Sequence, residues 1–357
     1  MNSARIELVK EMMEQARLDY FIMCDPQSID YCLDYYNEPG ERLYALIISK
    51  NDDHKIILND LFFVEDYLGL ETIYYSDTDD GVDVIVNSLD KPRRIGVDKN
   101  FPARFLLPLM ARIPNAKFIN ASPCVDMIRM NKDKNEQVLM IEASRINDKT
   151  MSDIVDKIKT GATEEEVADE IEKMYKANGG EGNSFTPIVA YGKNGANPHH
   201  MCDDSTLKPG DSIIIDVGCR YKGYCSDMTR TFFYKEASLK AKEVYELVKK
   251  ANATAEAYIK PGVRLCDIDA KARDLISEAG YGPQFNHRLG HFIGRDVHEY
   301  GDVSANFDLE VEEGMIFSIE PGVYIPGEFG VRIEDLVLVT EDGCKVLNSY
   351  TKDLTII

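Results

Sequence analysis

The stretch 209-PGDSIIIDVGCRYKGYCSDMTRTFF-233 decides the fold prediction. Its β-branched run at 213–215 predicts a core strand, Lys222-Gly223 predicts a turn, and 224–233 predicts the returning strand. Asp216 and Asp227 interrupt this apolar hairpin. With the turn centred on 221–222 they would lie directly opposite each other, with Cβ atoms about 4.5–5.5 Å apart, where like charges repel. A cation between the carboxylates would explain them, and an edge hairpin with both acids in water is the alternative.

An internal repeat extends this pattern over the second part of the chain. The sequence IKTG at 158–161, a helix and Gly179 recur as IKPG at 259–262, a helix and Gly280, at a constant offset of 101 residues. GDSIIIDVG at 210–218 aligns with GMIFSIEPG at 314–322 at an offset of 104 residues. Asp216 and Glu320 therefore hold equivalent places, and a second turn near Gly327 predicts that Glu320 lies opposite Glu334.

The repeat predicts two pseudosymmetric α+β halves in which the two hairpins meet and four carboxylates converge. Two acid pairs at equivalent places inside apolar strands are hard to explain as solvated edges. Four carboxylates in one place cannot all stay ionised without cations. The sequence therefore predicts a dinuclear metal site.

Histidines gather in the same part of the chain, since five of the six follow residue 198. A lone histidine is commonly a structural one, but beside four acids His291 becomes a natural fifth ligand. One nitrogen among oxygens favours Mn²⁺, with Co²⁺, Fe²⁺ or Zn²⁺ as alternatives. His199 and His298 precede the two hairpins by short loops and are expected to flank the metals as hydrogen-bond donors. His200 is expected behind the site or at the surface, and no HExxH or GxSxG motif offers a competing chemistry.

Composition limits the class of protein. A net charge of −21 over 357 residues argues against binding nucleic acid or an anionic membrane, because both need a basic face. No apolar run reaches the length of a membrane span, and no signal-like segment begins the chain. Eight cysteines without a CxxC pair favour reduced thiols and a cytoplasmic enzyme.

The first 124 residues predict a separate α/β domain. A helix at 3–17 precedes strands at 44–48, 55–58 and 94–97, a helix at 103–112 and a strand at 117–119. No glycine-rich loop follows a strand, so a dinucleotide site is not expected. After a boundary at 121–124, residues 135–159 predict a long helix, and the capping box at 163–166 opens another.

The motifs IIIDVG, SDMTRTF, GHFIG, SIEPGVY, GVRIEDLVLV and SFTPIVAYGKNGANPHH carry a resemblance over the whole chain. The chain resembles the pita-bread-fold metallopeptidases of the Xaa-Pro dipeptidase (prolidase) and aminopeptidase P branch. The resemblance implies a creatinase-type domain at 1–124 and a catalytic domain at 125–357. It also implies a homodimer and small peptide substrates with proline at the second position.

The resemblance assigns roles to individual residues. The implied ligands of the two ions are Asp216, Asp227, His291, Glu320 and Glu334, of which Asp227 and Glu334 bridge. Glu320 resembles the general acid and base. His199 and His298 resemble the residues that contact the scissile peptide, and His287 and Arg332 resemble groups lining the proline-side pocket, where Arg332 could pair a substrate carboxylate.

Four alternatives remain open. Aminopeptidase P shares the motifs, and the compact chain without extra insertions favours the dipeptidase. Creatinase uses the fold without metal, but its branch lacks the full ligand set. Methionine aminopeptidase normally lacks the N-terminal domain, and scaffold or nucleic-acid adaptor members lose ligands and carry basic patches.

Overall fold

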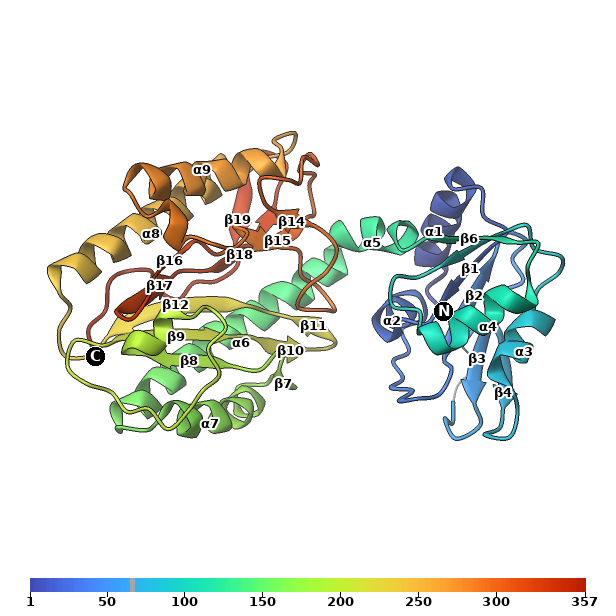
Figure 1. Ribbon diagram of the computed structural model, residues 1–357, viewed down its shortest axis with the longest axis horizontal. Coiled ribbons are helices and arrows are strands. Elements are labelled where there is room, and N and C mark those ends of the chain that lie inside the picture. Colours follow the sequence, from blue (N-terminus) through green and yellow to red (C-terminus); the bar gives the residue numbers. More distant parts are fainter. Residues whose placement is uncertain (65–67) are drawn as a thin grey trace. The chain divides into compact units, whose positions relative to one another are not determined.

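The computed structural model describes residues 1–64 and 68–357, which separate into two compact units, Met1–Ile128 and Arg129–Ile357 (Figure 1). The first unit holds a six-stranded sheet in the order β4-β3-β2-β1-β5-β6. Its strands are β1 (Tyr20–Met23), β2 (Ala45–Ser49), β3 (Lys55–Asn59), β4 (Glu71–Tyr75), β5 (Arg94–Val97) and β6 (Lys117–Asn120). Its helices are α1 (Ser3–Gln15), α2 (Pro26–Leu33), α3 (Gly81–Asn87) and α4 (Ala103–Arg112), and α5 (Pro123–Met130) crosses the boundary between the units.

The first unit is α/β, as the sequence predicts, because apolar strands alternate with amphipathic helices. Helix α1 begins where the Asn2 side chain accepts from the Arg5 N–H, and it buries Ile6, Val9 and Met13 at helical spacing. β1 and β2 are buried along their whole length, and β1 pairs antiparallel with β2 and parallel with β5. The sheet is therefore mixed, and its central strands have no solvent-facing side.

The second unit consists of two similar halves. The first half is built from α6 (Lys134–Lys159), α7 (Glu164–Ala177), β8 (Ile188–Tyr191), β9 (Ser212–Val217) and β12 (Met228–Phe233). The second half is built from α8 (Leu239–Tyr258), α9 (Leu265–Glu278), β15 (Ile316–Ile319), β18 (Asp335–Val339) and β19 (Cys344–Val346). Figure 1 shows α6 and α7 on one side of the strands and α8 and α9 on the other.

Matched backbone conformations confirm the internal repeat. Gly161 and Gly262, which end α6 and follow α8, have φ of +84° and +85°, and the turn residues Gly223 and Gly327 both have +78°. These left-handed conformations favour glycine, so the repeated glycines of the sequence mark repeated turns. The capping box predicted at Thr163 is formed with Glu166. The α+β fold of the two halves is therefore the predicted one.

The first hairpin corrects one prediction. Lys222 and Gly223, with φ of +47° and +78°, form the turn between β10 (Cys219–Tyr221) and β11 (Tyr224–Cys225). This register pairs Asp216 with Thr229, so the expectation that Asp216 lies directly opposite Asp227 is wrong. Moving the turn centre by one residue shifts every partner by two, which keeps both acids on one face of the hairpin.

The second hairpin has the predicted register. β15 pairs Ile319 with Asp335, and β16 (Gly322–Ile325) pairs Gly322 with Arg332 of β17 (Phe329–Arg332). Glu320 and Glu334 lie between these two ladders in the same register and therefore face each other. The remaining elements are β7 (Gly182–Asn183), β13 (Gly290–His291), β14 (Asp302–Val303) and the short 3₁₀ helices η1 (Gly192–Ala196) and η2 (Gly282–Gln284).

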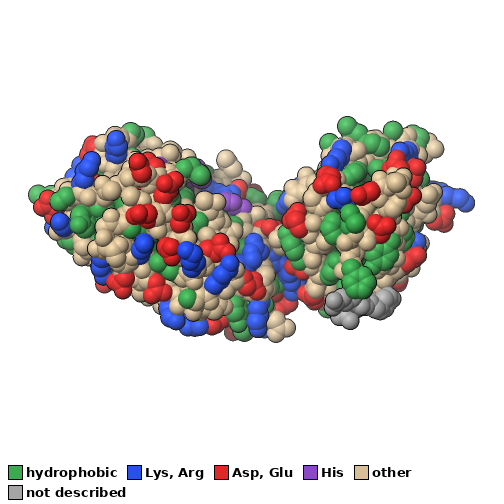
Figure 2. Space-filling model, turned by 90° about the horizontal axis from the view of Figure 1, so that it is seen from below, with side chains coloured by type: hydrophobic (Ala, Val, Ile, Leu, Met, Phe, Trp, Pro, Cys, Tyr) green, Lys and Arg blue, Asp and Glu red, His purple; other side chains and the backbone are tan. Residues whose placement is uncertain are grey.

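The surface carries the acidic excess of the sequence. Figure 2 shows acidic side chains spread over the face in view, with basic side chains between them. All eight cysteines are free thiols. Within residues 1–64 and 68–357, no helix combines the length and apolar character that a bilayer crossing requires.

Candidate metal centre

Buried acids and one histidine meet where the two halves of the second unit face each other. Asp227, His291 and Glu334 are buried and offer ligand atoms that all lie within 4.8 Å of one another. Nε2 of His291 lies 3.6 Å from Oδ2 of Asp227 and 3.6 Å from Oε1 of Glu320. The Asp216 carboxylate lies close enough to raise the pKa of Asp227, Glu320 and Glu334. The structure thus brings together all five residues that the sequence singled out.

The backbone around His291 fixes the direction of its ring. β13 packs so closely on β15 that a Cβ on Gly290 would lie 1.8 Å from the carbonyl oxygen of Ser318. The His291 N–H is bound to Oγ of Ser318 at 3.0 Å, and Nδ1 lies 3.1 Å from the Phe292 carbonyl. Because a carbonyl only accepts, Nδ1 carries the proton and Nε2 presents a lone pair to the acids.

Three carboxylate oxygens in the centre have no hydrogen-bond partner. Oδ1 of Asp216, Oδ1 of Asp227 and Oε1 of Glu334 are buried and unpartnered among the described residues. Leaving the acceptor of a buried carboxylate unsatisfied costs about 1–3 kcal/mol or more, so proteins rarely do it without a ligand. Oxygen-rich donors with one imidazole nitrogen are a suitable set for divalent cations, so the residues present fit the group that the sequence predicts.

The pKa shifts have the directions expected for crowded acids. Burial, reinforced by neighbouring carboxylates, raises the pKa of Asp227 and Glu334 well above the usual range. Burial also raises the pKa of Glu320 to about 7, although His291 and Arg332 oppose the shift. Burial lowers the pKa of His291, which keeps its imidazole neutral. A bound cation would favour the ionised form of these acids. It would also accept the lone pair of the neutral imidazole.

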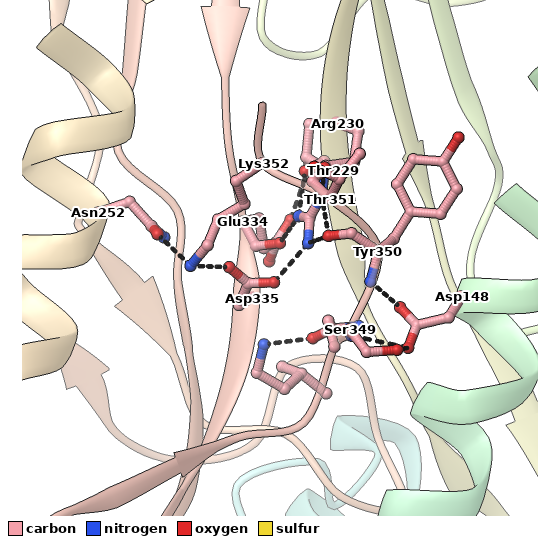
Figure 3. Close-up of polar contacts among 12 residues, drawn as sticks. Asp148, Thr229, Arg230, Asn252, Glu334, Asp335, Ser349, Tyr350, Thr351 and Lys352 are labelled. Atoms are coloured by element: carbon pink, nitrogen blue, oxygen red, sulfur yellow. Dashed lines mark hydrogen bonds and ion pairs between the residues drawn. The ribbon is translucent and has the colours of Figure 1, made fainter. Parts of the chain in front are cut away.

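A buried arginine and a threonine hold Glu334 in place (Figure 3). The Thr229 hydroxyl donates to Oε2 of Glu334 at 2.7 Å, which leaves the other oxygen unpartnered. Arg230 is 1% exposed and donates to the carbonyls of Thr229 and Glu334 at 2.9 and 2.6 Å and to Asp335 at 2.7 Å. Its remaining bonds reach the carbonyls of Tyr350 and Thr351. These contacts tie Glu334 to both halves of the unit and to residues near its C-terminal end.

Arg332 lies beside Asp216 and is turned inward. Its guanidinium donates to Oδ2 of Asp216 at 2.6 Å, to the Tyr324 hydroxyl at 2.9 Å and to the Thr229 hydroxyl at 3.0 Å. The Tyr324 hydroxyl is also 3.0 Å from Nε2 of His287, and burial lowers the pKa of His287 to about 3. Arg332, Tyr324 and a neutral His287 therefore form one wall next to the acids.

The two flanking histidines come from separate loops. The ring of His298 packs edge-on against that of His291, with 4.3 Å between centroids, and burial lowers its pKa to about 4. His199 is exposed, follows η1, and lies close enough to His298 and His287 to contribute to lowering the pKa of both. His298 thus lies directly beside the candidate ligand His291, and His199 lies near His298 and His287.

A second group of possible metal ligands consists of Glu164, His200 and Asp203. Nε2 of His200 is hydrogen-bonded to Oε2 of Glu164 at 2.6 Å, and Glu164 also accepts from the backbone N–H groups of Tyr191 and Asp203. These donors already satisfy the buried Glu164 carboxylate. The group therefore anchors the loop that carries His199, which agrees with the expectation that His200 lies behind the site.

Sequence reasoning did not identify Thr229 and Tyr324. Both lie on a strand two or four residues from an acid, in the register Asp227–Thr229 and Glu320–Tyr324, so their side chains point to the same face as the acid. Because alternate residues of a strand share one face, counting outward from each acid in steps of two would have found them.

Comparisons with known proteins agree with this architecture. Residues 138–341 match Metallopeptidase family M24, and residues 5–131 match the Creatinase/Prolidase N-terminal domain. The chain is 36% identical to a Lactobacillus helveticus Xaa-Pro dipeptidase, over 99% of this chain and 98% of that protein.

Solved structures are similarly close. An Xaa-Pro dipeptidase from Bacillus anthracis is 31% identical, with a TM-score of 0.92 over 100% of both chains. An X-Pro aminopeptidase from Thermotoga maritima is 30% identical, with a TM-score of 0.83 over 97% of this chain and 100% of that one.

Proposed function

Because this chain belongs to metallopeptidase family M24, we propose that it is an exopeptidase that hydrolyses the bond before proline in Xaa-Pro dipeptides. The observation that carries the proposal is the set of three buried, unpartnered carboxylate oxygens gathered with Nε2 of His291. The full-length similarity to Xaa-Pro dipeptidases supports the choice of substrate.

We propose that two divalent cations are held by Asp216, Asp227, His291, Glu320 and Glu334, with Asp227 and Glu334 shared between them. Four carboxylates and one imidazole favour Mn²⁺ among the candidates, with Co²⁺, Fe²⁺ or Zn²⁺ as alternatives. Bound there, the cations would lower the pKa of a water molecule and polarise the carbonyl of the scissile peptide.

The remaining steps belong to the chain's own residues. Glu320, whose side chain is 16% exposed, would take the proton of the attacking water and deliver it to the proline nitrogen. His298 and His199 would donate hydrogen bonds to the substrate carbonyl and its oxyanion. His287 and Arg332 would line the pocket for the proline ring, with Tyr324 fixing their orientation.

The test is turnover by the Mn²⁺-loaded protein of an Xaa-Pro dipeptide and of the matching Xaa-Ala dipeptide. We expect cleavage of the first and little of the second. Glu320→Gln should abolish turnover while leaving the fold intact, which thermal unfolding of the metal-free proteins would check. Glu328→Gln, an exposed acid on the same hairpin, is the matched control. Full activity of Glu320→Gln, or equal cleavage of both dipeptides, would contradict the proposal.

Aminopeptidase P is the second candidate, because the structure is also similar to an X-Pro aminopeptidase. An Xaa-Pro-Xaa tripeptide distinguishes the two, since a dipeptidase should leave it intact. Metal analysis addresses the creatinase and scaffold alternatives: two bound ions per chain would support the peptidase, and none after Mn²⁺ loading would oppose it. We also propose a cytoplasmic homodimer, which cell fractionation and light scattering would test.

A further inference from the structure

A pocket in the first unit is lined by an unusual number of cations. It has a volume of ≈ 680 Å³ and holds Arg17, Lys50, Lys91, Arg93, Arg94 and Lys117. Asp19 and Asp90 are the acids that line it. The pocket is therefore locally basic in a chain whose net charge is −21.

The sheet register explains why residues so far apart in sequence meet here. β1 begins at Tyr20, which pairs with Ser49 at the end of β2 and with Ile95 near the start of β5. Arg94, the first residue of β5, pairs with Lys117, the first residue of β6. The adjacent ends of β2, β1, β5 and β6 thus gather these basic residues where the strands begin or end. We call this group of residues the basic edge.

Asp19 binds three groups at the basic edge. One carboxylate oxygen of Asp19 accepts the backbone N–H groups of Arg93 and Arg94 at 2.8 and 3.0 Å, and the other binds Nζ of Lys50. Asp19 therefore fixes the backbone and neutralises one lysine. Asp19 binds Arg93 through its backbone N–H.

Nε of Arg94 donates to the Ala16 carbonyl at 3.0 Å, but the other four cations lack partners in the part of the chain that the structure describes. Within the described residues, the side chains of Arg17, Lys91, Arg93 and Lys117 have no ion pair or hydrogen bond. Elsewhere on this acidic surface lysines and arginines commonly pair, as Lys10 does with Glu7 and Arg112 with Asp80. Uncompensated like charges in one pocket repel, and an anion would remove that cost.

Two of these cations sit on a strained backbone. Arg17 has a φ of +55° and Lys91 a φ of +42°, where glycine or asparagine is the usual residue. Holding a long side chain in that conformation costs about 1 kcal/mol each, and such strain concentrates at binding sites. Arg17 also follows the C-terminal end of α1, where a cation is favourable, so the strain at Lys91 is the stronger sign.

From this geometry we propose that the basic edge binds a compact anion bearing two phosphate groups. Guanidinium groups bind phosphate bidentately, and several nearby cations match several charges. A long polyanion would leave the pocket and meet the acidic surface within about one Debye length, ~8 Å at physiological salt, so a small ligand is favoured. The volume lies in the range of about 300–1,000 Å³ that is common for small-molecule sites.

The test is isothermal titration of the full-length, metal-loaded protein with fructose 1,6-bisphosphate. Arg93→Gln/Lys117→Gln removes two unpartnered cations of the basic edge. Arg104→Gln/Lys173→Gln removes the same charges from exposed positions outside it and is the matched control. We expect the first pair of substitutions to weaken binding at least tenfold and the control pair to change it less than twofold. Divalent ions elsewhere in the protein would bind the probe equally in every variant, so comparing the variants removes their contribution to the measured affinity.

A second probe, inorganic pyrophosphate, identifies what is recognised. Similar affinity for both probes would assign recognition to the phosphates, and tighter binding of the sugar bisphosphate would add contacts to its carbon skeleton. Absence of binding by the wild type, or equal weakening in both variants, would overturn the proposal. Peptidase activity is not the readout, so the result is independent of the proposed function.

Discussion

Thr229 offers a sharp test of how the protein shell controls the metal centre. Its hydroxyl donates to Oε2 of Glu334 at 2.7 Å and accepts from Nε of Arg332 at 3.0 Å. Thr229→Val removes both bonds and keeps the shape of the side chain. The bond to Glu334 is between buried groups, so no water replaces it.

The magnitude depends on the charge of Glu334. Without a cation, burial and neighbouring acids raise the pKa of Glu334, so the hydrogen bond meets a neutral carboxyl group, and it is then worth about 0.5–1.5 kcal/mol. With a cation bound, the carboxylate is ionised and the same bond is worth about 1.5–3 kcal/mol. The difference of about 1–1.5 kcal/mol is the part that appears in metal affinity, which corresponds to roughly a 5- to 12-fold loss.

The assay is calorimetric titration of metal-free protein with Mn²⁺ at neutral pH, beside urea unfolding. Thr231→Val is the matched control, because Thr231 is equally buried on the same strand but bonds only to the backbone of Arg332. We expect both variants to lose similar unfolding free energy and only Thr229→Val to lose Mn²⁺ affinity. Unchanged affinity in Thr229→Val, or the same loss in Thr231→Val, would refute the reasoning.

Three further predictions follow from other parts of the structure. Burial alone would raise the pKa of Glu299, but the charges of Arg129 and Lys132 lower it to about 2. This acid should therefore stabilise the fold by about 3 kcal/mol at neutral pH. The contribution should fade as pH falls from about 4.5 to about 2. Urea unfolding of Glu299→Gln should therefore differ from the wild type at pH 7 and converge with it in acid; a gap that does not depend on pH would contradict this. Gly290→Ala should destabilise the protein by several kcal/mol and prevent Mn²⁺ binding, because the added carbon meets a backbone oxygen at 1.8 Å, whereas Gly343→Ala, with no neighbour nearer than 3.9 Å, should be tolerated in thermal unfolding. Removing metal with a chelator should lower the melting temperature most at alkaline pH. The raised pKa values of the buried acids mean that the metal-free fold binds protons more tightly than the unfolded chain does, so its stability should fall as pH rises from about 4 through 7. The stability of the metal-loaded protein should not show this pH dependence.

Local signals and the repeat were sufficient to predict much of the fold. The capping box at Thr163 and the left-handed glycines are short-range features that the structure reproduces. β1 was not predicted, because its four residues are all apolar and all buried and so show neither alternation nor helical spacing. Its place is fixed by pairing with β2 and β5, which is long-range information.

The candidate site shows the same division. The spacing of the acids predicted their meeting, since a two-residue register error leaves the face of the strand unchanged. The direction of Arg332, which turns toward Asp216, depends on side-chain packing between strands of different halves. The pairing of His200 with Glu164 spans 36 residues and has no local signature.

The network around Arg230 has a consequence for how this protein is made (Figure 3). Arg230 leaves the ribosome with its strand, but its partners Asp335 and Tyr350 are synthesised more than 100 residues later. At about 5–20 residues per second, that interval lasts roughly 5–25 s. During this interval the charge of Arg230 on β12 lacks its acidic partner Asp335. Glu334, which lies beside Asp227 in the folded protein, has not yet been synthesised.

We therefore expect the nascent second unit to remain incompletely folded around Arg230 until the chain has been synthesised beyond Asp335. We expect ribosome-bound chains that stop before Asp335 to remain sensitive to protease across 209–233. Once these residues are synthesised, we expect their docking to neutralise the charge on Arg230 and to bring Glu334 beside Asp227.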